Sequence, residues 1–307
     1  MKNKKITVKT HGKVILIGEH SVVYGKDALA LPVKALNITT TVENSPEIES
    51  TMITNNYQGP YLQAPPEYNG LKYVFKTLNR LANNSKPLKI TYTGKIPMER
   101  GFGSSAVVAL GTTKALDKYF DLHLSKEKAM DITNHAEMIN HGKASGLDAA
   151  TVSSDYLVFF NKKTGPHSLS QKLGATLLIM DTGELGNTKK AVEIVRNKVQ
   201  TNQTETAKID ALGKLATQTK ELWLKQDAPA IGKIFNEAEK ILESLDIATE
   251  RINQICKIAQ KNGALGAKLS GGGLGGIVIA LCDNKNTATE IAKKAQENFT
   301  NYWIEEI

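Results

Sequence analysis

The sequence predicts a protein that mixes helices and strands and is large enough for two domains. A length of 307 residues suits one large or two medium domains with a substantial core. Short apolar runs at residues 13–18 and 277–282 have the length and composition of buried strands. In other segments, such as residues 71–81, apolar side chains recur with the spacing of an amphipathic helix. Both kinds of element are therefore expected along the chain.

The first half of the chain alternates the two patterns. The expected strands are residues 13–18, 36–42, 87–93 and 156–160, and the expected helices are residues 71–81, a helix that begins near residue 104, and residues 126–141. The polar, proline-containing segment up to about residue 67 is expected to be irregular. Gly142 is expected to end the helix before it.

The second half is expected to be richer in helix. The expected helices are residues 188–201, 207–224, 229–245, 249–261 and 287–298, and the expected strands are residues 175–180, 277–282 and 302–304. Between the halves lies a polar connection at residues 162–173. This connection predicts two domains, residues 1–170 and 171–307.

Composition narrows the classes of function. The formal charge of +8 and the pI near 9.2 are compatible with nucleic-acid binding, but the lysines are scattered and no nucleic-acid motif is present. We therefore expect no nucleic-acid partner and a basic surface that favours anionic substrates. Two cysteines without metal-site spacing indicate a reducing cytosol. No apolar segment has the length of a signal or a membrane span, so a cytoplasmic protein without a membrane partner is expected.

Residues 97–106 have the features of a phosphate cradle. They spell Pro-Met-Glu-Arg-Gly-Phe-Gly-Ser-Ser-Ala and lead directly into a helical pattern. The N-terminus of a helix offers unpaired N–H groups and a partial positive charge, which attract an anion. Glycines before the helix let backbone N–H groups approach phosphate oxygens closely. A serine in the first turn adds a hydroxyl that can face a metal ion.

Three other interpretations compete for this stretch. A serine-rich helix cap with turning glycines is the better interpretation of such a motif in isolation. A dinucleotide fingerprint fits residues 101–106 but needs a strand that runs into the first glycine, and residues 97–100 intervene. A P-loop needs a lysine after its last glycine, which is missing. The stretch alone leaves the choice open.

Other segments place reactive side chains at element ends. Glu19 and His20 follow the first strand, Glu137 lies near the end of a helix, and Asp148 follows a turn at Ser145. Each alone has a structural explanation: a solvated acid, a surface histidine or a helix cap. Residues 271–276 contain five glycines in six positions, which suggests that backbone passes close to a ligand or to another strand. A tight hairpin is the alternative.

Three of these segments, in order, resemble the signatures of the GHMP kinase superfamily. They are residues 12–20 (Gly-Lys-Val-Ile-Leu-Ile-Gly-Glu-His), residues 97–106 and residues 268–276 (Lys-Leu-Ser-Gly-Gly-Gly-Leu-Gly-Gly). Within the superfamily the nearest resemblance is to the mevalonate kinase family, through residues 13–25 and 137–148. The chain departs from the family at His11, at Phe102 between the loop glycines, and at residues 140–144. None of these departures removes a side chain that the chemistry needs.

The resemblance implies a two-domain α+β fold. Its N-terminal α/β domain is of the ribosomal-protein-S5-like type, its C-terminal domain is ferredoxin-like, and the active site lies between them. It also implies ATP-dependent phosphorylation of mevalonate to 5-phosphomevalonate in isoprenoid biosynthesis, with Mg²⁺ as cofactor and ATP as co-substrate. A homodimer is compatible with the resemblance, although the sequence does not report oligomeric state. Phosphomevalonate kinase, homoserine kinase and a non-catalytic metabolite sensor remain as alternatives.

The matching motifs also carry over residue roles. Asp148 would be the catalytic base, and Lys13 would lie beside it. Ser105 and Glu137 would hold Mg²⁺. The phosphates of ATP would contact Arg100, Gly101, Phe102, Gly103, Ser104 and Ser105. The substrate would contact Lys13, Glu19, His20, Asp148, Thr188, Gly271 and Gly272.

Overall fold

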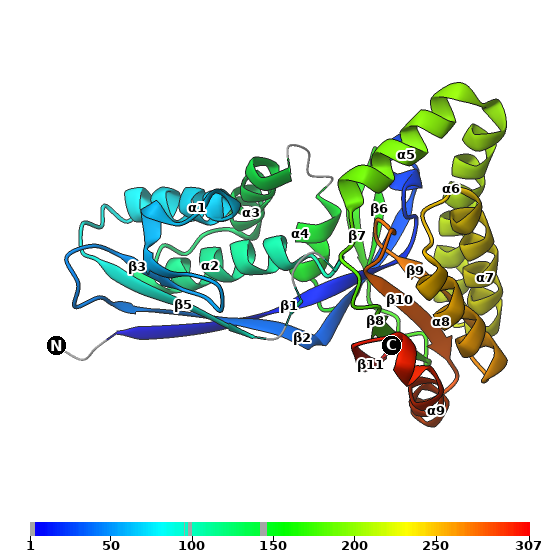
Figure 1. The fold of residues 1–307 in the computed structure, drawn as a ribbon. Coiled ribbons are helices and arrows are strands. Elements are labelled where there is room, and N and C mark those ends of the chain that lie inside the picture. The colour runs from blue at the N-terminus through cyan, green and yellow to red at the C-terminus, as the bar shows by residue number, and fades with distance from the viewer. Residues whose placement is uncertain (1–3, 95, 98–99, 142–145) are drawn as a thin grey trace. The chain divides into compact units, whose positions relative to one another are not determined.

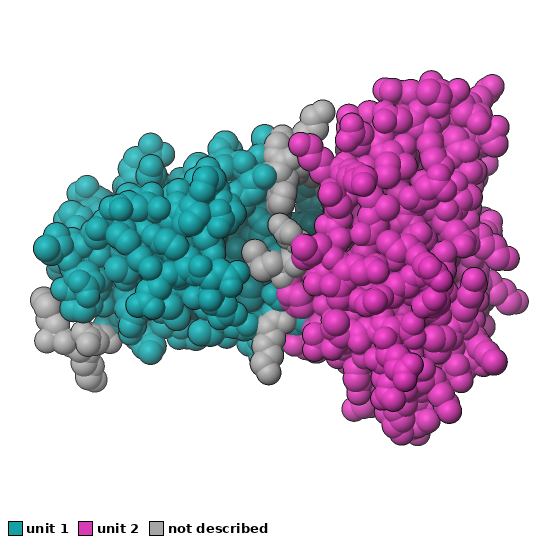
Figure 2. Space-filling view, viewed as in Figure 1, with its two compact units in different colours: residues 1–12, 36–96, 103–153 teal, residues 13–35, 97–102, 154–307 magenta. Residues whose placement is uncertain are grey.

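The structure is a computed structural model that describes residues 4–94, 96–97, 100–141 and 146–307. The turn predicted at Ser145, the helix end predicted at Gly142 and two residues of the predicted cradle lie outside these ranges. The chain divides into two compact units (Figure 2). Unit 1 comprises residues 1–12, 36–96 and 103–153, and unit 2 comprises residues 13–35, 97–102 and 154–307. The domain boundary predicted near residue 170 stays a prediction.

Unit 1 places helices on one side of a group of strands (Figure 1). Its strands are the first part of β1 (Lys5–Ile17), the later part of β2 (Ala28–Asn44), β3 (Thr51–Ile53), β4 (Gln58–Pro60) and β5 (Leu88–Gly94). Its helices are α1 (Asn69–Leu81), α2 (Ser104–Phe120), α3 (Lys126–His141) and α4 (Leu147–Val152), with 3-10 turns at Tyr61–Gln63 and Pro66–Tyr68. β5 pairs antiparallel with β2 and parallel with β3.

Helix α2 is the central element of unit 1. Apolar and small side chains cover most of its circumference, and it packs against α1, α3 and α4. Its two buried threonines are hydrogen-bonded: Thr112 Oγ1 lies 2.8 Å from Tyr92 Oη, which lies 2.7 Å from Tyr61 Oη, and Thr113 Oγ1 donates to the Ala109 carbonyl at 2.9 Å. A helix buried in this way is fixed by packing, so its N-terminal serines are held in place.

Unit 2 contains a four-stranded antiparallel sheet in the order β11-β8-β10-β9. Its strands are β6 (Leu157–Asn161), β7 (Gly165–Leu169), β8 (Thr176–Asp181), β9 (Gly266–Ser270), β10 (Ile277–Cys282) and β11 (Asn301–Glu306). Its helices are α5 (Thr188–Thr201), α6 (Gln203–Leu224), α7 (Ala228–Ser244), α8 (Glu250–Lys261) and α9 (Lys285–Ala295), with 3-10 turns at Ser21–Tyr24 and Gln296–Asn298. Helices α7, α8 and α9 pack on this sheet. A separate hairpin, β6–β7, pairs with the first residues of β2.

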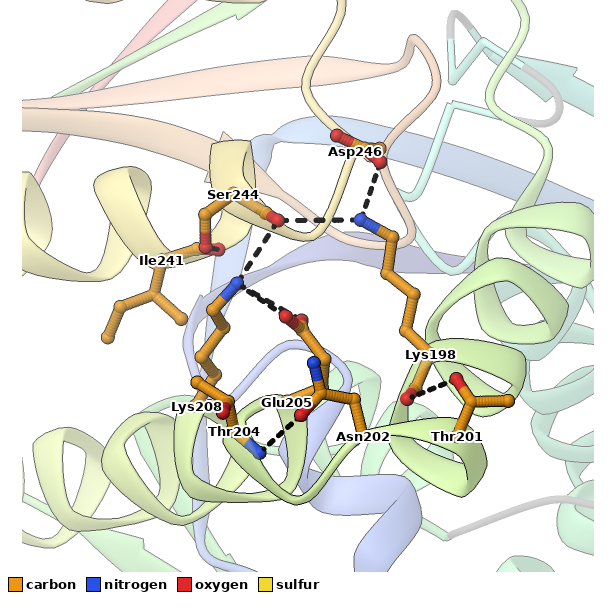
Figure 3. A network of polar contacts seen from close by, with 9 residues as sticks. All are labelled: Lys198, Thr201, Asn202, Thr204, Glu205, Lys208, Ile241, Ser244 and Asp246. Atoms are coloured by element: carbon orange, nitrogen blue, oxygen red, sulfur yellow. Dashed lines mark hydrogen bonds and ion pairs between the residues drawn. The ribbon is translucent and has the colours of Figure 1, made fainter.

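Two lysines fasten α5 and α6 to the end of α7 (Figure 3). Lys198 Nζ lies 2.5 Å from Asp246 Oδ2 and 3.5 Å from the Ser244 carbonyl oxygen. Lys208 Nζ lies 3.3 Å from the same carbonyl and 2.9 Å from Glu205 Oε1. The last carbonyls of a helix lack partners within the helix and carry partial negative charge, so cations stabilise this end.

The mixed α+β class is confirmed, as are the predicted helices, with shifts of a few residues at their ends. Two differences have a clear cause. The predicted connection at 162–173 contains β7, which forms because β6 offers it a hairpin partner. Residues 266–270, Gly-Ala-Lys-Leu-Ser, were not predicted as a strand because they have low strand propensity, but β10 pairs with them along their length. Among the described residues, no helix is long and apolar enough to cross a bilayer.

Candidate active site: two groups of residues

The predicted site residues fall into two groups, one in each compact unit. Gly103, Ser104, Ser105, Glu137 and Asp148 belong to unit 1. The predicted residues of unit 2 are Lys13, Glu19, His20, Arg100, Gly101, Phe102, Thr188, Gly271 and Gly272. Each group is described within its own unit.

The N-terminus of α2 carries the first group. Gly103 is the N-cap, with a left-handed φ of 69°, and its carbonyl accepts a 3.0 Å hydrogen bond from Val107 N–H. A glycine cap has no side chain to occupy the first N–H groups of the helix, which leaves them to an anion. Ser104 and Ser105 form the first turn. This geometry is compatible with the predicted phosphate cradle, and phosphate binding there stays a prediction.

Ser105 is tied to α3 by two hydrogen bonds. Its hydroxyl donates to Glu137 Oε1, and Asn140 Nδ2 donates to the Ser105 oxygen at 3.0 Å. Asn140 Oδ1 in turn accepts from Gly70 N–H at 3.0 Å, which links α3 to α1. Sequence reasoning missed Asn140. Its position three residues after Glu137, on the same helix face, is the signal that could have identified it.

The pair of Ser105 and Glu137 fits a magnesium ion. Both supply oxygen donors, Glu137 is only 6% exposed, and the two side chains are already in contact. Mg²⁺ prefers oxygen and is commonly held by one or two protein ligands, with phosphates and water completing the shell. In the described part of the chain no cluster of three or more His, Cys, Asp or Glu side chains could hold a metal by itself. Any metal at this pair would thus depend on substrate phosphates.

Asp148 lies in the first turn of α4 and is half-buried. Gly146 caps this short helix with a left-handed φ of 83°, and α4 packs against α2 and α3. An acid in the first turn also stabilises the positive end of a helix, so the position has a structural explanation as well as a catalytic one. Its catalytic role stays a prediction.

In unit 2, β1 lies beside the loop that precedes α2. Lys13 is 3% exposed, and its Nζ donates to the Gly101 carbonyl at 3.0 Å, while its backbone N–H donates to the Phe102 carbonyl at 3.0 Å. Phe102 is buried against Trp303, with ring centroids 5.2 Å apart. The loop is thereby held by a backbone hydrogen bond to β1, by the packing of Phe102, and by the hydrogen bond from the Lys13 ammonium.

Arg100 adds a second positive charge to this loop. Its Nε lies 3.5 Å from Asp181 Oδ1 at the end of β8. Its Nη1 is buried and has no hydrogen-bond partner among the described residues. A buried, unsatisfied guanidinium donor is costly to leave unpaired, so an anionic ligand that reaches it would gain binding energy.

The glycine-rich segment after β9 brings several predicted residues together. Ser270 Oγ donates to the Ile15 carbonyl at 2.7 Å, which holds the end of β9 against β1. A Cβ on Gly271 would lie 3.8 Å from Gly101 Cα, and one on Gly272 would lie 2.7 Å from Thr188 Oγ1. Only glycine fits at position 272 without displacing Thr188. The predicted close approach of backbone is therefore confirmed here, and the same segment is the loop of the β9–β10 hairpin, the alternative interpretation.

His20 contacts the same segment. Its Nε2 lies 2.8 Å from the Gly272 carbonyl oxygen. Burial lowers the pKa of His20, so the ring is neutral near pH 7. Because a carbonyl can only accept, the proton resides on Nε2, and Nδ1 carries a lone pair that can accept a hydrogen bond from a hydroxyl.

Glu19 has a different environment from the one expected of a substrate ligand. It is 1% exposed and ion-paired with Lys268, which is fully buried. Burial raises the pKa of Glu19, and the Lys268 charge opposes this rise. Sequence reasoning placed Lys268 in the third signature but gave it no role, because the signature does not indicate that the lysine is buried. Direct contact of Glu19 with substrate stays a prediction.

A buried acid beside this pair predicts pH-dependent stability. Glu239 Oε2 accepts from Leu269 N–H at 2.7 Å, and burial raises the pKa of Glu239 from 4.5 to about 7. Such a group contributes stability below pH 4.5 that is lost as the pH rises through about 7. Glu239→Gln should therefore reduce the loss of unfolding free energy between pH 5 and pH 8 by about 3 kcal/mol. Urea unfolding at the two pH values measures this, with the exposed Glu237→Gln on the same helix as control. Equal pH slopes in wild type and Glu239→Gln would contradict it.

Comparisons with known proteins show which family the chain resembles. The models of the GHMP kinase N-terminal and C-terminal domains match residues 70–155 and 214–301. A mevalonate kinase of Pyrococcus furiosus is 29% identical over 94% of this chain and 93% of its own. One of Saccharolobus solfataricus is 27% identical over 90% of each chain. The crystal structure of mevalonate kinase from Staphylococcus aureus is 28% identical and covers 99% of each chain, with a TM-score of 0.75.

A more distant structure, that of L. major mevalonate kinase in complex with R-mevalonate, shares the fold at 22% identity with a TM-score of 0.83, over 98% of this chain and 95% of its own. The two domain models lie in the expected order and together span more than half of the sequence. The similar proteins of known name match both halves. The chain therefore belongs to the GHMP kinases.

Proposed function

We propose that the protein transfers the γ-phosphoryl group of ATP to the C5 hydroxyl of mevalonate, which gives 5-phosphomevalonate for isoprenoid biosynthesis. Its membership of the GHMP kinases makes it an ATP-dependent small-molecule kinase. The near full-length similarity to mevalonate kinases supports mevalonate as the acceptor. The observation that carries the proposal is the contact between Ser105 and Glu137 at the cradle helix. A cytoplasmic location and a homodimer stay predictions.

Phosphoryl transfer requires aligned reactants and neutralised charge, and little covalent work by the protein. The backbone N–H groups at Gly103–Ser105 and the positive end of α2 would receive the phosphates of ATP. Arg100, Gly101 and Phe102 would continue this contact, with Arg100 Nη1 as a charged donor. The protein's contribution here is binding and orientation.

Ser105 and Glu137 would hold Mg²⁺, and Asn140 would keep the Ser105 hydroxyl in place. When bound, the ion supplies positive charge that neutralises phosphate oxygens. Asn140 can hold the Ser105 hydroxyl because the Asn140 side-chain oxygen is itself fixed by a hydrogen bond from Gly70 N–H. Asn140 would therefore orient Ser105, one of the two proposed metal ligands.

Asp148 would accept the proton of the attacking hydroxyl, and the Lys13 ammonium would counter charge on the transferred group. The hydrogen bond from Lys13 Nζ to the Gly101 carbonyl orients the lysine ammonium within the loop. His20, through Nδ1, would accept a hydrogen bond from a substrate hydroxyl. Thr188, Gly271 and Gly272 would border the substrate from the glycine-rich segment.

An ADP-release assay tests the activity directly. The purified chain is offered ATP and Mg²⁺ with mevalonate, phosphomevalonate, homoserine or galactose in turn. Release that depends on mevalonate, with 5-phosphomevalonate identified by mass, is the expected result. Preference for one of the other acceptors would assign a sister kinase, and ATP binding without release on any acceptor would assign a non-catalytic sensor. Either result would overturn the proposal.

Replacing Ser105 with alanine should increase the Mg²⁺ concentration needed for half-maximal rate. The hydroxyl is lost, and Glu137 and Asn140 lose their shared partner. We expect a shift of roughly tenfold, which corresponds to about 1.4 kcal/mol. Ser153→Ala, which removes only a hydrogen bond to the Ala150 carbonyl within the same unit, is the control. Mg²⁺ titrations that coincide for Ser105→Ala and wild type would exclude this role.

A further inference from the structure

We propose that Lys268 is a positioning residue for this reaction: its buried ion pair with Glu19 holds the turn that carries His20 against the glycine turn at residues 271–273. The inference rests on the proposed function, because it concerns the binding of the acceptor substrate. It assigns Lys268 a role through His20 and no contact with substrate. It also gives Glu19 a supporting task inside the protein.

Lys268 is enclosed by protein, and its ammonium group has hydrogen-bond acceptors within the fold. Its side chain has no exposed surface, and neither has that of Glu19. Lys268 Nζ donates to Glu19 Oε1 and, at 2.6 Å, to the Leu269 carbonyl, and it lies 5.8 Å from the centre of the Phe235 ring. Glu239 binds the N–H of Leu269 from the other side. Lys268 therefore joins the Glu19 turn to β9 at the point where β9 leads into the glycines.

A contribution to folding stability does not account well for a buried ion pair of this kind. Desolvation of two charges offsets most of their attraction, and well-packed apolar side chains of similar volume are often as stable or more so. Glu19 Oε2 has no hydrogen-bond partner among the described residues, so the pair is incompletely compensated. What a buried pair can supply is a fixed conformation.

The conformation that needs fixing is the backbone of the Glu19 turn. Gly18 has φ 103°, and a Cβ there would lie 2.6 Å from Ala28 Cα. His20 has φ 59°, which is unfavourable for a residue with a side chain and persists only when surrounding contacts impose it. Glu19 lies between them. An anchor on Glu19 therefore holds both unusual residues in place.

The same anchor acts on the partner of His20. His20 Nε2 binds the Gly272 carbonyl, and Gly272 lies four residues after Lys268 on the chain. Between them, Ser270 Oγ binds the Ile15 carbonyl. Both sides of the His20–Gly272 hydrogen bond are thus tied to the Lys268–Glu19 pair. Loss of the pair should release His20, and with it the lone pair on Nδ1 that would meet the substrate.

A double-mutant cycle tests this coupling. The variants are Lys268→Met, His20→Ala and the two combined, with the exposed Lys240→Met on α7 as control. We expect Lys268→Met to raise the KM for mevalonate about fivefold, the factor given by losing one hydrogen bond of average strength. The KM for ATP should change little. In the His20→Ala background, Lys268→Met should add almost nothing to the KM for mevalonate, because both act through one contact.

A second variant distinguishes a positioning role of the ion pair from the destabilisation caused by leaving one charge buried alone. Lys268→Met leaves Glu19 buried without a counter-charge, which lowers the melting temperature. Glu19→Gln/Lys268→Met removes both charges, so melting temperature should recover while the KM for mevalonate stays high. If the KM recovers together with the melting temperature, or if the His20 and Lys268 effects add fully, the pair is only structural and the inference fails. Failure of the wild type to release ADP with mevalonate would instead reject the proposed function.

Discussion

Asp148→Asn is expected to lower kcat by roughly 10²- to 10⁴-fold, the usual contribution of a positioned general base. Asparagine keeps the size of the side chain but cannot take the proton from the attacking hydroxyl. ATP binding should be unchanged, because the proposed phosphate contacts lie at α2 and its preceding loop. Single-turnover ADP release and equilibrium nucleotide binding, measured on the same sample, check both statements.

The control for Asp148→Asn is Asp131→Asn, an exposed acid on α3 in the same unit. It should leave kcat within the error of wild type. An Asp148→Asn variant with near-normal kcat would show that Asp148 is only a favourable acid in the first turn of α4. A change in its melting temperature alone would support the same structural explanation.

Lys13→Met should lower kcat by roughly 10²- to 10³-fold, the cost of removing one preorganised charge that stabilises a transition state. Methionine approximates the length of the lysine stem, so packing is largely retained. The Gly101 carbonyl loses its donor, which loosens the loop. The KM for ATP should therefore rise as well, although less than kcat falls.

Lys9→Met, an exposed lysine earlier on β1, is the comparison for Lys13→Met. Both remove one positive charge from the same strand. Equal effects of the two substitutions on kcat would mean that Lys13 acts through net charge only. A Lys13→Met variant that keeps kcat would exclude it from the chemistry.

Helices and strands were predictable where the apolar pattern within the segment itself indicates the element. Helices such as α1 follow from apolar spacing, and the run that forms β10 is apolar at every position. β9 was not predictable, since its residues favour a strand only when β10 lies beside them. β1 also begins earlier than expected, at Lys5, and this first part of the strand pairs with β2. Pairing between distant segments decided these cases.

The candidate site shows the same limit. Glu137 and Ser105 were identified because each lies in a recognisable motif, and the structure places them in contact. Asn140 needed knowledge that Gly70 lies beside α3. The pairing of Lys268 with Glu19 joins residues 249 positions apart. A buried lysine is identified by its surroundings, and its surroundings come from the whole fold.

The interleaved composition of unit 2 has a consequence during synthesis on the ribosome. Residues 13–35 emerge early, but residues 154–307, which complete the unit, emerge last. Leu29 and Val33, both fully buried in the finished protein, therefore wait in the nascent chain without their partners. At about 5–20 residues per second, residue 307 emerges roughly 15–55 s after residue 35. β11, which lies at the edge of the sheet beside β8, is translated after the other three strands of that sheet, so the growing chain depends on protection from aggregation until β11 has emerged.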